Sequence, residues 1–591
     1  MSEATAAMAN APDVPTANAP EAAEEQVLAP RADWRGVVRV GLLGGAVGLY
    51  LCLVGIVPTF DPRALVAGII SLGDTALLGT GLAIGYLASL RSPDGPRRSI
   101  AAGALAGTIA GSMLTLFVIL GSILDLRAIA LHASPVTYGI LTFGLGVAGS
   151  WIPTVVLGLA GAVAGGIAVL PRRVRRPIIL GLMSLLVVGL FAGVIRTPML
   201  ASPLTSALGR FLFAPEGLTV AGAIVTLIAA IGGQALSRRL GVRQRVREMP
   251  EKQRRRLSIP LLVVGVVFVL WLPQGVGSFF AQVVAVVTLY VLMGFGLNIT
   301  LGLAGLLDLG FVAFFAVGAY TVGLLTATGE FGIAGWPFWA AVPFAVVLSM
   351  LFGAFLGLPI LGIRGDYLAI ATLGFGEIIR ILAGSDLMKP LLGGPRGITS
   401  IPKPIEASPD SFLAGPLQIY YIALACAVVV AFVAIRLRDS RLGRAWVAIR
   451  EDEDVAEAMG INLVQTKLLA YMLGAAFAGL GGAIFATLLG AIISSSINLF
   501  VSINVAAIII VGGMGSIPGV VLGSIFLIGI PELFREFSEY RFLFYGVALI
   551  AMMIYRPAGL LPSRIIKREL HASDAAHPAD PTAVPVTETG R

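Results

Sequence analysis

The chain has 591 residues, of which 57% are hydrophobic and only 13% are charged, and its mean hydropathy is +0.92. A soluble domain cannot keep that much apolar surface out of water, so the composition excludes a soluble protein and predicts an all-α polytopic membrane protein. The 73 glycines suit close packing of membrane helices. The two cysteines, Cys52 and Cys426, lie in apolar stretches and predict neither a disulfide framework nor a metal site.

The first part of the chain predicts a tail followed by a membrane block. Residues 1–30 are rich in Ala, Pro and Glu, lack an apolar run, and are expected to form a disordered tail and not a signal peptide. Residues 31–237 are expected to form about six membrane helices, each long enough to cross about 30 Å of hydrocarbon. They lie at roughly 36–57, 65–90, 99–124, 138–170, 177–195 and 217–236. The fourth stretch is overlong, and Pro153 is expected to kink or divide it.

The loops between these stretches alternate in charge. The loops near 91–98 and 171–176 are basic, as is the linker at 238–257, in which residues 238–256 hold nine Lys and Arg against two Glu, a net charge of +7. The positive-inside rule places all three in the cytosol, together with the N-terminus. Because topology explains this charge, nucleic-acid binding is not expected.

A second block of about ten apolar stretches follows, which brings the expected total to about sixteen membrane helices. The block covers residues 258–564, and residues 565–591 are expected to be a second disordered tail. The stretches lie at roughly 258–273, 279–301, 304–327, 337–362, 366–384, 417–436, 468–490, 500–514, 518–534 and 541–556. Counting from the basic linker places the charged segment 436–467 and the C-terminus in the cytosol.

Polar residues at membrane depth accompany two glycines early in this block. Asn298, Thr300 and Asp308 surround Gly302 and Gly305. One interpretation is a helix broken at the glycines, which exposes backbone dipoles to a polar solute. The alternative is that the glycines only allow helices to cross, with the aspartate at the cytosolic edge.

Two further motifs follow in the same block. Glu377 and Arg380 are three residues apart on one predicted helix and can pair. Buried, the pair could line a pore or lock a conformation; at the membrane interface it would be a solvated ion pair. The run with Gly512, Gly513 and Gly515 lacks the Lys-Ser/Thr of a nucleotide loop and predicts a helix break.

The segment 436–467 is densely charged and must lie outside the hydrocarbon. Its apolar residues, among them Trp446 and Met459, recur at three- to six-residue steps, which predicts an amphipathic helix. Gly460 is expected to end that helix as a C-cap. A membrane protein that presents such a helix to the cytosol is expected to dock a partner there, although a solvated connecting loop is the plainer alternative.

Taken together, these motifs resemble the permeases of ATP-binding-cassette importers, and most of all the branched-chain amino-acid (LivM-type) permeases, over about 300 residues from 258 to 564. The resemblance implies that segment 436–467 docks on cytosolic ATPase subunits, with coupling residues Gly443, Arg444, Arg450, Glu451, Asp452, Glu457, Ala458 and Gly460. It implies a translocation path near Asn298, Thr300, Asp308, Tyr320, Glu377 and Arg380. Members of the family usually lack the first block, for which an accessory role is expected.

The resemblance also implies the partners and the energy source. These are a second homologous permease subunit, two ATPase subunits that use ATP and Mg²⁺, and an extracytoplasmic solute-binding protein, in a bacterial-type inner membrane. The chain has no ATP-binding loop, is expected to bind no cofactor or metal itself, and is not expected to be an enzyme. The alternatives are the same machine for urea or short amides, or a proton-coupled secondary transporter that uses Asp308, Glu377 or Asp74.

Overall fold

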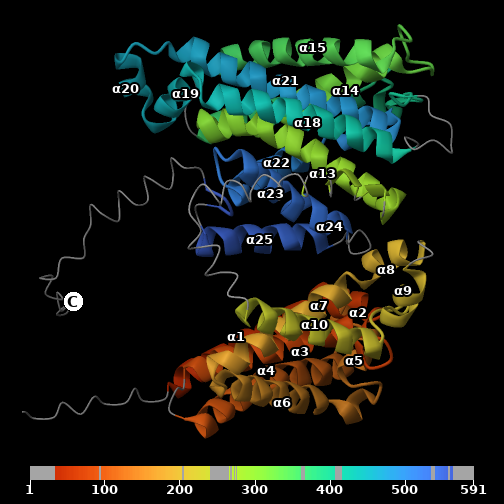
Figure 1. Cartoon of the computed structure of the whole chain (residues 1–591), viewed down its shortest axis with the longest axis vertical. Helices are drawn as coiled ribbons and strands as arrows, with labels where there is room; N and C mark the ends of the chain where they lie inside the picture. The colour runs from red at the N-terminus through yellow and green to blue at the C-terminus, as the bar shows by residue number, and fades with distance from the viewer. Residues whose placement is uncertain are drawn as a thin grey trace, which may run out of the picture. The chain divides into compact units, whose positions relative to one another are not determined.

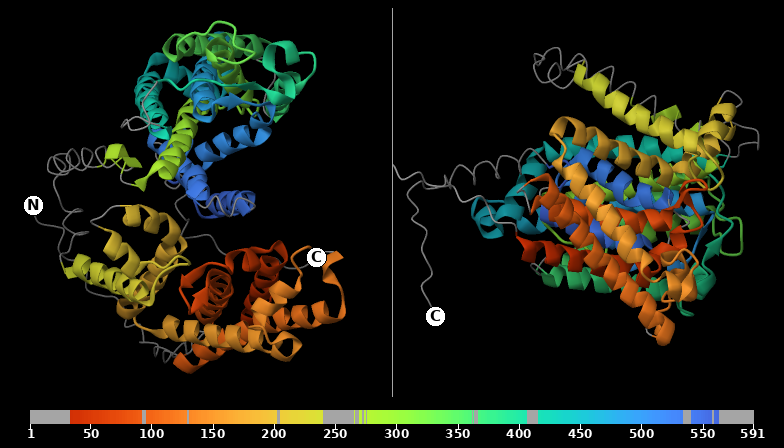
Figure 2. Two further views of the ribbon diagram at one scale, coloured as in Figure 1. Left: turned by 90° about the vertical axis from the view of Figure 1, so that its right-hand side faces the viewer. Right: turned by 90° about the horizontal axis from the view of Figure 1, so that it is seen from below.

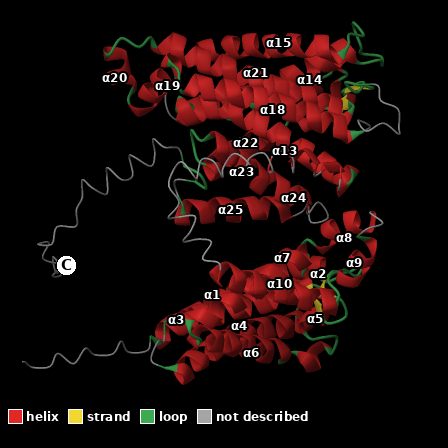
Figure 3. Cartoon of the chain, viewed as in Figure 1, coloured by secondary structure: helices red, strands yellow, loops and turns green. Residues whose placement is uncertain are grey.

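The structure is a computed structural model that describes residues 33–91, 95–128, 130–201, 205–239, 265, 269–271, 273–274, 276–360, 362, 366–405, 415–533, 540–556 and 559–562. The expected tails, almost all of the basic linker and most of stretch 258–273 lie outside these residues. The chain divides into two compact units. Unit 1 comprises Met1–Ala192 and Phe211–Arg239, and unit 2 comprises Gly193–Arg210 and Leu240–Arg591. The described residues are mostly helical, with two short strand pairs (Figure 3).

The first part of the chain consists of helices and one small antiparallel strand pair, and the long helices of unit 1 pack side by side (Figure 2). The elements are α1 (Trp34–Val54), α2 (Ile56–Phe60), β1 (Ala64–Val66), β2 (Ile70–Ser71), α3 (Leu72–Leu90), α4 (Pro96–Ile123), η1 (Leu126–Ala128), α5 (Pro135–Leu141), η2 (Gly146–Gly149), α6 (Ile152–Val169), α7 (Arg172–Leu190), α8 (Ala192–Ala201), α9 (Ser206–Leu212) and α10 (Val220–Arg239). The overlong stretch 138–170 is divided, because α6 begins only at Ile152.

Glycines let the helices of unit 1 approach one another closely. A Cβ added at Gly103 of α4 would lie 2.3 Å from the backbone oxygen of Gly161 on α6. A Cβ added at Gly107 of α4 would lie 2.1 Å from the backbone oxygen of Leu157, also on α6. Gly85 of α3 faces the same point of α6, because a Cβ added at Gly85 would lie 2.4 Å from the Gly161 Cα. Because lipid tails are as apolar as the side chains, such close backbone packing is a main source of association between membrane helices.

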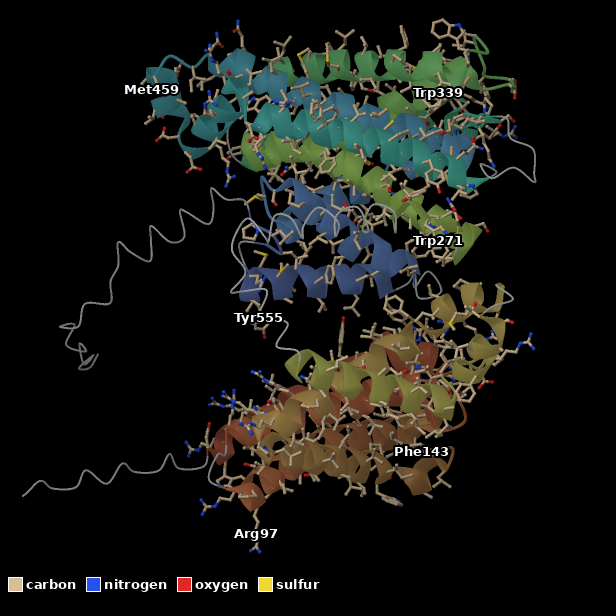
Figure 4. All side chains as sticks on the ribbon, viewed as in Figure 1. Arg97, Phe143, Trp271, Trp339, Met459 and Tyr555 are labelled. Atoms are coloured by element: carbon tan, nitrogen blue, oxygen red, sulfur yellow. The ribbon has the colours of Figure 1, made fainter. Side chains whose placement is uncertain are left out.

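The basic loops after α3 and before α7 lie at one end of the unit 1 bundle. Arg175 in the first turns of α7 lies with its guanidinium carbon 5.9 Å from the ring centroid of Tyr86, near the end of α3. Arg91 follows α3 directly, and Arg97 lies in the first turn of α4. Figure 4 places Arg97 at this end of the unit and Phe143 at the other. The fold therefore brings two of the basic loops to one side, as alternating loops require.

Unit 2 is a second helical bundle in which several helices are broken (Figure 1). Its elements from residue 278 onward are α13 (Ser278–Leu297), the π-helical turn η3 (Asn298–Leu303), α14 (Val312–Thr326), α15 (Phe338–Ile360), α16 (Asp366–Gly384), α17 (Lys389–Leu392), η4 (Gly394–Arg396), β3 (Ile398–Thr399), α18 (Pro416–Arg438), α19 (Arg441–Glu451), α20 (Glu453–Ala458), α21 (Leu463–Leu489), β4 (Ala491–Ile492), η5 (Ser494–Ser496), α22 (Leu499–Gly512), α23 (Ile517–Ser524), the π-helical turn η6 (Ile525–Gly529), α24 (Ile530–Leu533) and α25 (Arg541–Tyr555).

The small-residue helix α21 forms the centre of unit 2, where it packs against α13, α14 and α15. Its glycines meet the backbone of neighbours: a Cβ at Gly482 would lie 2.0 Å from the Phe315 oxygen, and one at Gly318 of α14 would lie 2.1 Å from the Gly479 oxygen. Two large side chains, Tyr471 of α21 and Trp446 of α19, are almost fully buried.

Nine helices among the described residues are long and apolar enough to cross a membrane, or ten if α7 and α8 form one bent span, and five shorter apolar helices accompany them. The chain is thus a multi-pass, all-α membrane protein. The expected total of about sixteen spans stays a prediction. Two expected spans are shorter than predicted. Residues 304–311 are not helical, so the stretch 304–327 contributes only α14. Residues 65–71 lie in the β1–β2 strand pair and its turn, so the stretch 65–90 contributes only α3.

Candidate functional site: the charged segment and the broken helices

The charged segment between α18 and α21 folds into two short helices, α19 and α20, which protrude from one end of the unit 2 bundle (Figure 1). Gly443 is needed at the corner, because a Cβ there would lie 2.3 Å from the backbone oxygen of Arg438. Ser440 caps α19 through a hydrogen bond from Gly443 N to its Oγ at 3.3 Å. A hydrogen bond from Arg438 lowers the pKa of Asp439, which lies in the turn between α18 and α19.

Two buried contacts attach the helix pair to the start of α21. Trp446 of α19 is fully buried, and its Nε1 donates a hydrogen bond to the backbone oxygen of Thr466 at 2.8 Å. Lys467, only 4% exposed, places its Nζ 2.7 Å from Oε1 of Glu453, the first residue of α20. Both helices are therefore attached to the start of α21, a central helix of the bundle.

The short helix α20 has well-defined ends and an exposed face. Asp452 caps its start by accepting a hydrogen bond from Val455 N at 3.0 Å. Gly460 closes it in the left-handed conformation, φ +86°, with Gly460 N donating to Glu457 O and Ile461 N to Ala456 O. Met459, directly before Gly460, is 79% exposed and is labelled in Figure 4.

The candidate coupling residues divide into outward and inward groups. Arg444, Glu451, Glu457 and Ala458 are exposed, as a docking surface requires. Arg450 instead points into the bundle, where its Nη1 donates a hydrogen bond to the backbone oxygen of Gly302 in η3 at 2.9 Å. The other two exposed candidates, Asp452 and Gly460, begin and close α20 as described above.

The first helix break, at Gly302 and Gly305, lies against α19. After the π-helical turn η3 the chain leaves the helix, and Gly305 takes φ +72°, a conformation that favours glycine. A Cβ at Gly305 would lie 2.8 Å from Cγ of Arg450, so the arginine side chain occupies the space beside this glycine. Arg450 is thus in contact with both glycines of the break, Gly302 and Gly305.

A second break, between α22 and α23, is joined to the first by Asn298. Its Oδ1 accepts a hydrogen bond from Gly515 N at 2.9 Å, and both groups are buried. Gly513 and Gly515 have φ of +111° and +73°, which end α22 after Gly512. The two breaks are thus joined by a buried hydrogen bond.

The segment that follows α25 packs on this second break. Leu560 N donates to Val511 O at 2.8 Å, and Leu561 N donates to Gly512 O at 3.0 Å. A Cβ at Gly559 would lie 2.5 Å from the Gly513 Cα. Elements that are distant in sequence thus meet at one point near α19.

Asp308 lies in the non-helical stretch between η3 and α14 and is 1% exposed. Its Oδ1 accepts a hydrogen bond from Gly310 N at 2.9 Å. The same stretch is held by Leu309 N, which donates to Thr372 Oγ1 of α16, and by Val312 N, which donates to Ser502 Oγ of α22. The aspartate therefore shapes a buried turn.

Of the remaining path candidates, Thr300 belongs to the first break, because its backbone oxygen accepts a hydrogen bond from Leu306 N at 2.9 Å. The others, Tyr320, Glu377 and Arg380, are joined to this group by no described hydrogen bond or ion pair. Thr300 is buried in η3 and donates to the Leu297 oxygen at 3.1 Å. Tyr320 is buried on α14 at 6% exposure. Glu377 and Arg380 form a bidentate ion pair on α16. Arg380 Nε lies 2.9 and 3.0 Å from the two carboxylate oxygens, and Arg380 Nη2 donates a hydrogen bond to Oε1. Their side chains are 42% and 36% exposed, so this unit does not bury the pair.

Sequence reasoning did not identify three of these contacts: Arg450 with Gly302, Asn298 with Gly515, and Lys467 with Glu453. The last carried a sequence signal, because Lys467 stands inside the apolar helix pattern that begins at Leu463. A lysine there must find a buried partner. The other two contacts join residues that are 148 and 217 positions apart, and no local sequence pattern predicts them.

Comparison with known proteins places this geometry in a family. A family model described as the permease component of branched-chain amino acid transport systems matches residues 279–555. The chain is 39% identical over 323 residues to the high-affinity branched-chain amino acid transport system permease protein LivM of Salmonella typhimurium, which covers 51% of this chain and 74% of the relative. It is 24% identical over 247 residues to a probable LivM of Methanocaldococcus jannaschii, 38% of this chain and 68% of the relative.

A more distant match is the permease LivH of Escherichia coli, 31% identical over 133 residues, which cover 22% of this chain and 42% of the relative. No solved structure matches the chain. The family is a transport permease component and not a catalytic enzyme. The matched region contains α19, α20 and both helix breaks. The chain therefore belongs to the LivM-type permeases of branched-chain amino acid transport systems.

Proposed function

We propose that this chain is a membrane permease subunit of an ATP-binding-cassette importer that carries branched-chain or other hydrophobic amino acids. The observation that carries the proposal is the protruding helix pair α19–α20. It offers an exposed face at its tip and is anchored to α21 and to a broken helix at its base. Such a pair can convert an external push into movement of membrane helices, and membership in the family supplies the class of solute.

The driving force comes from partner subunits. Two cytoplasmic ATPase subunits bind ATP and Mg²⁺ and contact the exposed residues Arg444, Glu451, Glu457 and Ala458, because the chain itself has no nucleotide-binding loop. A second homologous permease completes the path, and an extracytoplasmic solute-binding protein delivers the solute. ATPase closure then shifts the permease between inward- and outward-open states.

The path proposed for the solute runs beside the broken helices. Asn298, Thr300 and Asp308 line or shape the first break, and Tyr320, Glu377 and Arg380 lie farther along α14 and α16. The glycines of both breaks allow the backbone to bend when the coupling helices move. The relatives' names give branched-chain amino acids, and no observation favours urea, short amides or a proton-coupled mechanism over them.

The proposed organisation keeps about sixteen spans in two blocks, residues 31–237 and 258–564, in a bacterial-type inner membrane. The coupling helices and both termini face the cytosol, since the basic loops require that orientation. The first block has an accessory role, such as scaffolding against partner subunits, and the tails 1–30 and 565–591 and the linker 238–257 connect or extend the blocks.

The test is leucine uptake by the complete transporter in proteoliposomes supplied with ATP. Replacing Glu457 by Lys reverses a charge on the exposed face, and replacing Gly460 by Val strains its φ of +86°. Both changes should abolish ATP-driven uptake and leave membrane insertion intact, because neither residue packs inside the bundle. Normal uptake with both replaced, or uptake that needs no ATPase subunit, would refute the proposal.

A further inference from the structure

The helix α16 carries charge on an otherwise apolar open face. Tyr367, Ile370, Ile378 and Ile381 recur along one side of the helix, and each is more than half exposed in this chain. Glu377, one position before Ile378, flanks this side and holds Arg380 in the ion pair described above. The face is therefore neither uniformly apolar nor uniformly polar.

Contact with lipid would be unfavourable for this face of α16, because it carries a charged pair. Glu377 lies seven residues before the end of α16 at Gly384, or about 10 Å at 1.5 Å per residue. A charged pair at that depth is costly against hydrocarbon and is expected to face protein or a water-filled cavity. The open faces of α15 and α18 differ, because α15 has no charged residue and α18 has charges only in its last turn. Those faces suit lipid.

Water alone does not suit the face either, because it would leave three isoleucines and a tyrosine in contact with solvent. Gly374 lies on the same side, between Ile370 and Ile378, and a Cβ there would meet nothing within 4 Å. The glycine leaves a notch that a neighbouring membrane helix can enter closely. An apolar surface with a notch and one ion pair at its edge has the composition of a protein interface.

We propose that the open face of α16 is the surface on which a second permease subunit of the same family packs, with the Glu377–Arg380 pair enclosed at the seam. The inference rests on the proposed function, which requires such a subunit. The pair uses the N–H groups on Nε and Nη2 of Arg380, so the partner is expected to offer a carbonyl or carboxylate acceptor to Nη1. The partner surface is thus a membrane helix with one acceptor facing the notch.

Photocrosslinking in membranes that hold the complete transporter tests the contact directly. Benzoylphenylalanine is placed at Ile378 of the full chain, and in a matched control at Phe355 on the open face of α15, which is 69% exposed. We expect position 378 to give a product that mass spectrometry identifies as this chain joined to a second copy or to a homologous permease. Position 355 should give lipid adducts.

A second variant tests the notch without disturbing the fold. Because nothing lies within 4 Å of a Cβ at Gly374, Gly374→Leu should fold normally but fill the notch. We expect recovery of the second permease with the tagged chain to fall about tenfold. The control is Gly546→Leu on α25, where the space is equally open, and its recovery should be unchanged.

The outcomes separate cleanly. Lipid adducts at position 378, crosslinks from 378 into residues 33–239 of the same chain, or full recovery of the partner with Gly374→Leu would each overturn the assignment. ATP-driven leucine uptake by the unmodified transporter is measured in the same membranes. If uptake is present while these contacts fail, the interface is wrong and the proposed function stands; if uptake is absent, the proposed function itself fails.

Discussion

At the residue scale, Arg450 and Lys467 do most to connect the coupling helices to the membrane bundle. Arg450 reaches the Gly302 oxygen of the first helix break, and Lys467 holds Glu453 at the start of α20. Lys467 is almost fully buried and Arg450 is half-buried, and removing one partner of a buried charged contact costs more than the contact contributes when intact.

Replacing Arg450 by Ala should reduce ATP-driven uptake by roughly tenfold or more, since a hydrogen bond to a charged group contributes about 1.5–3 kcal/mol. The loss also empties the space beside Gly305, so the break is no longer supported. Uptake and ATP hydrolysis measured together should show hydrolysis that persists without transport. Arg441→Ala, an exposed change on the same helix, is the control, and equal uptake by the two variants would contradict the role given to Arg450.

Replacing Lys467 by Ala should lower the free energy of unfolding by about 3 kcal/mol, because it removes the Nζ that lies 2.7 Å from the partly buried Glu453 carboxylate. The double variant Lys467→Met with Glu453→Leu should recover most of that loss, since apolar residues of similar volume remove both charges. Thermal unfolding of the purified transporter measures the difference. A single variant as stable as the exposed change Lys389→Met would argue against a structural ion pair.

At the scale of elements, glycine positions decide which helices touch. On α4 and α6 of unit 1 the backbones meet where Gly103, Gly107 and Gly161 lie, and on α14 and α21 of unit 2 they meet at Gly318 and Gly479. The helix breaks use glycine differently, for positive φ at Gly305, Gly513 and Gly515. One residue type thus serves both rigid packing and bending.

Gly107→Leu should therefore separate α4 from α6, because a Cβ there would lie 2.1 Å from the Leu157 oxygen. We expect destabilisation of at least about 3 kcal/mol and loss of protease resistance in unit 1. Gly166→Leu on α6 provides the control, since nothing lies within 4 Å of its Cβ. Limited proteolysis in membranes gives the readout, and equal resistance of the two variants would show that this approach is not needed.

At the scale of the whole molecule, unit 2 has two chemically different ends. Figure 4 places Met459 and Tyr555 at one end of this unit and Trp271 and Trp339 at the other. The first end carries α19 and α20 with their charges, whereas exposed tryptophans are typical of a membrane–water interface. The two ends are therefore expected to face opposite sides of the membrane.

This orientation can be measured with single cysteines in a chain whose Cys52 and Cys426 are replaced by Ala. Met459→Cys should react with a membrane-impermeant maleimide only when the cytosolic face is accessible. Ile333→Cys, 66% exposed in the loop before α15, should react only from outside. Labelling of position 459 from outside would contradict the proposed coupling role, since the proposed ATPase subunits are cytosolic.

The sequence by itself determined what depends on composition and local order. Its apolar content required a membrane, and the glycine runs at Gly302 and Gly512 indicated the breaks. Helical periodicity in 436–467 indicated a helix there, and the motif order carried the family. Each of these is decided within a few turns of chain, where water, lipid and backbone sterics act locally.

Only the tertiary structure decided which distant groups meet. It showed that Arg450 points inward to Gly302 and not outward to a partner, that Asn298 joins two breaks through Gly515, and that the pair Glu377–Arg380 remains open on α16. It also showed that Asp308 lies in a non-helical stretch. Such pairings depend on the packing of whole helices, in which a residue's partner is set by the geometry of the bundle and not by its neighbours in sequence.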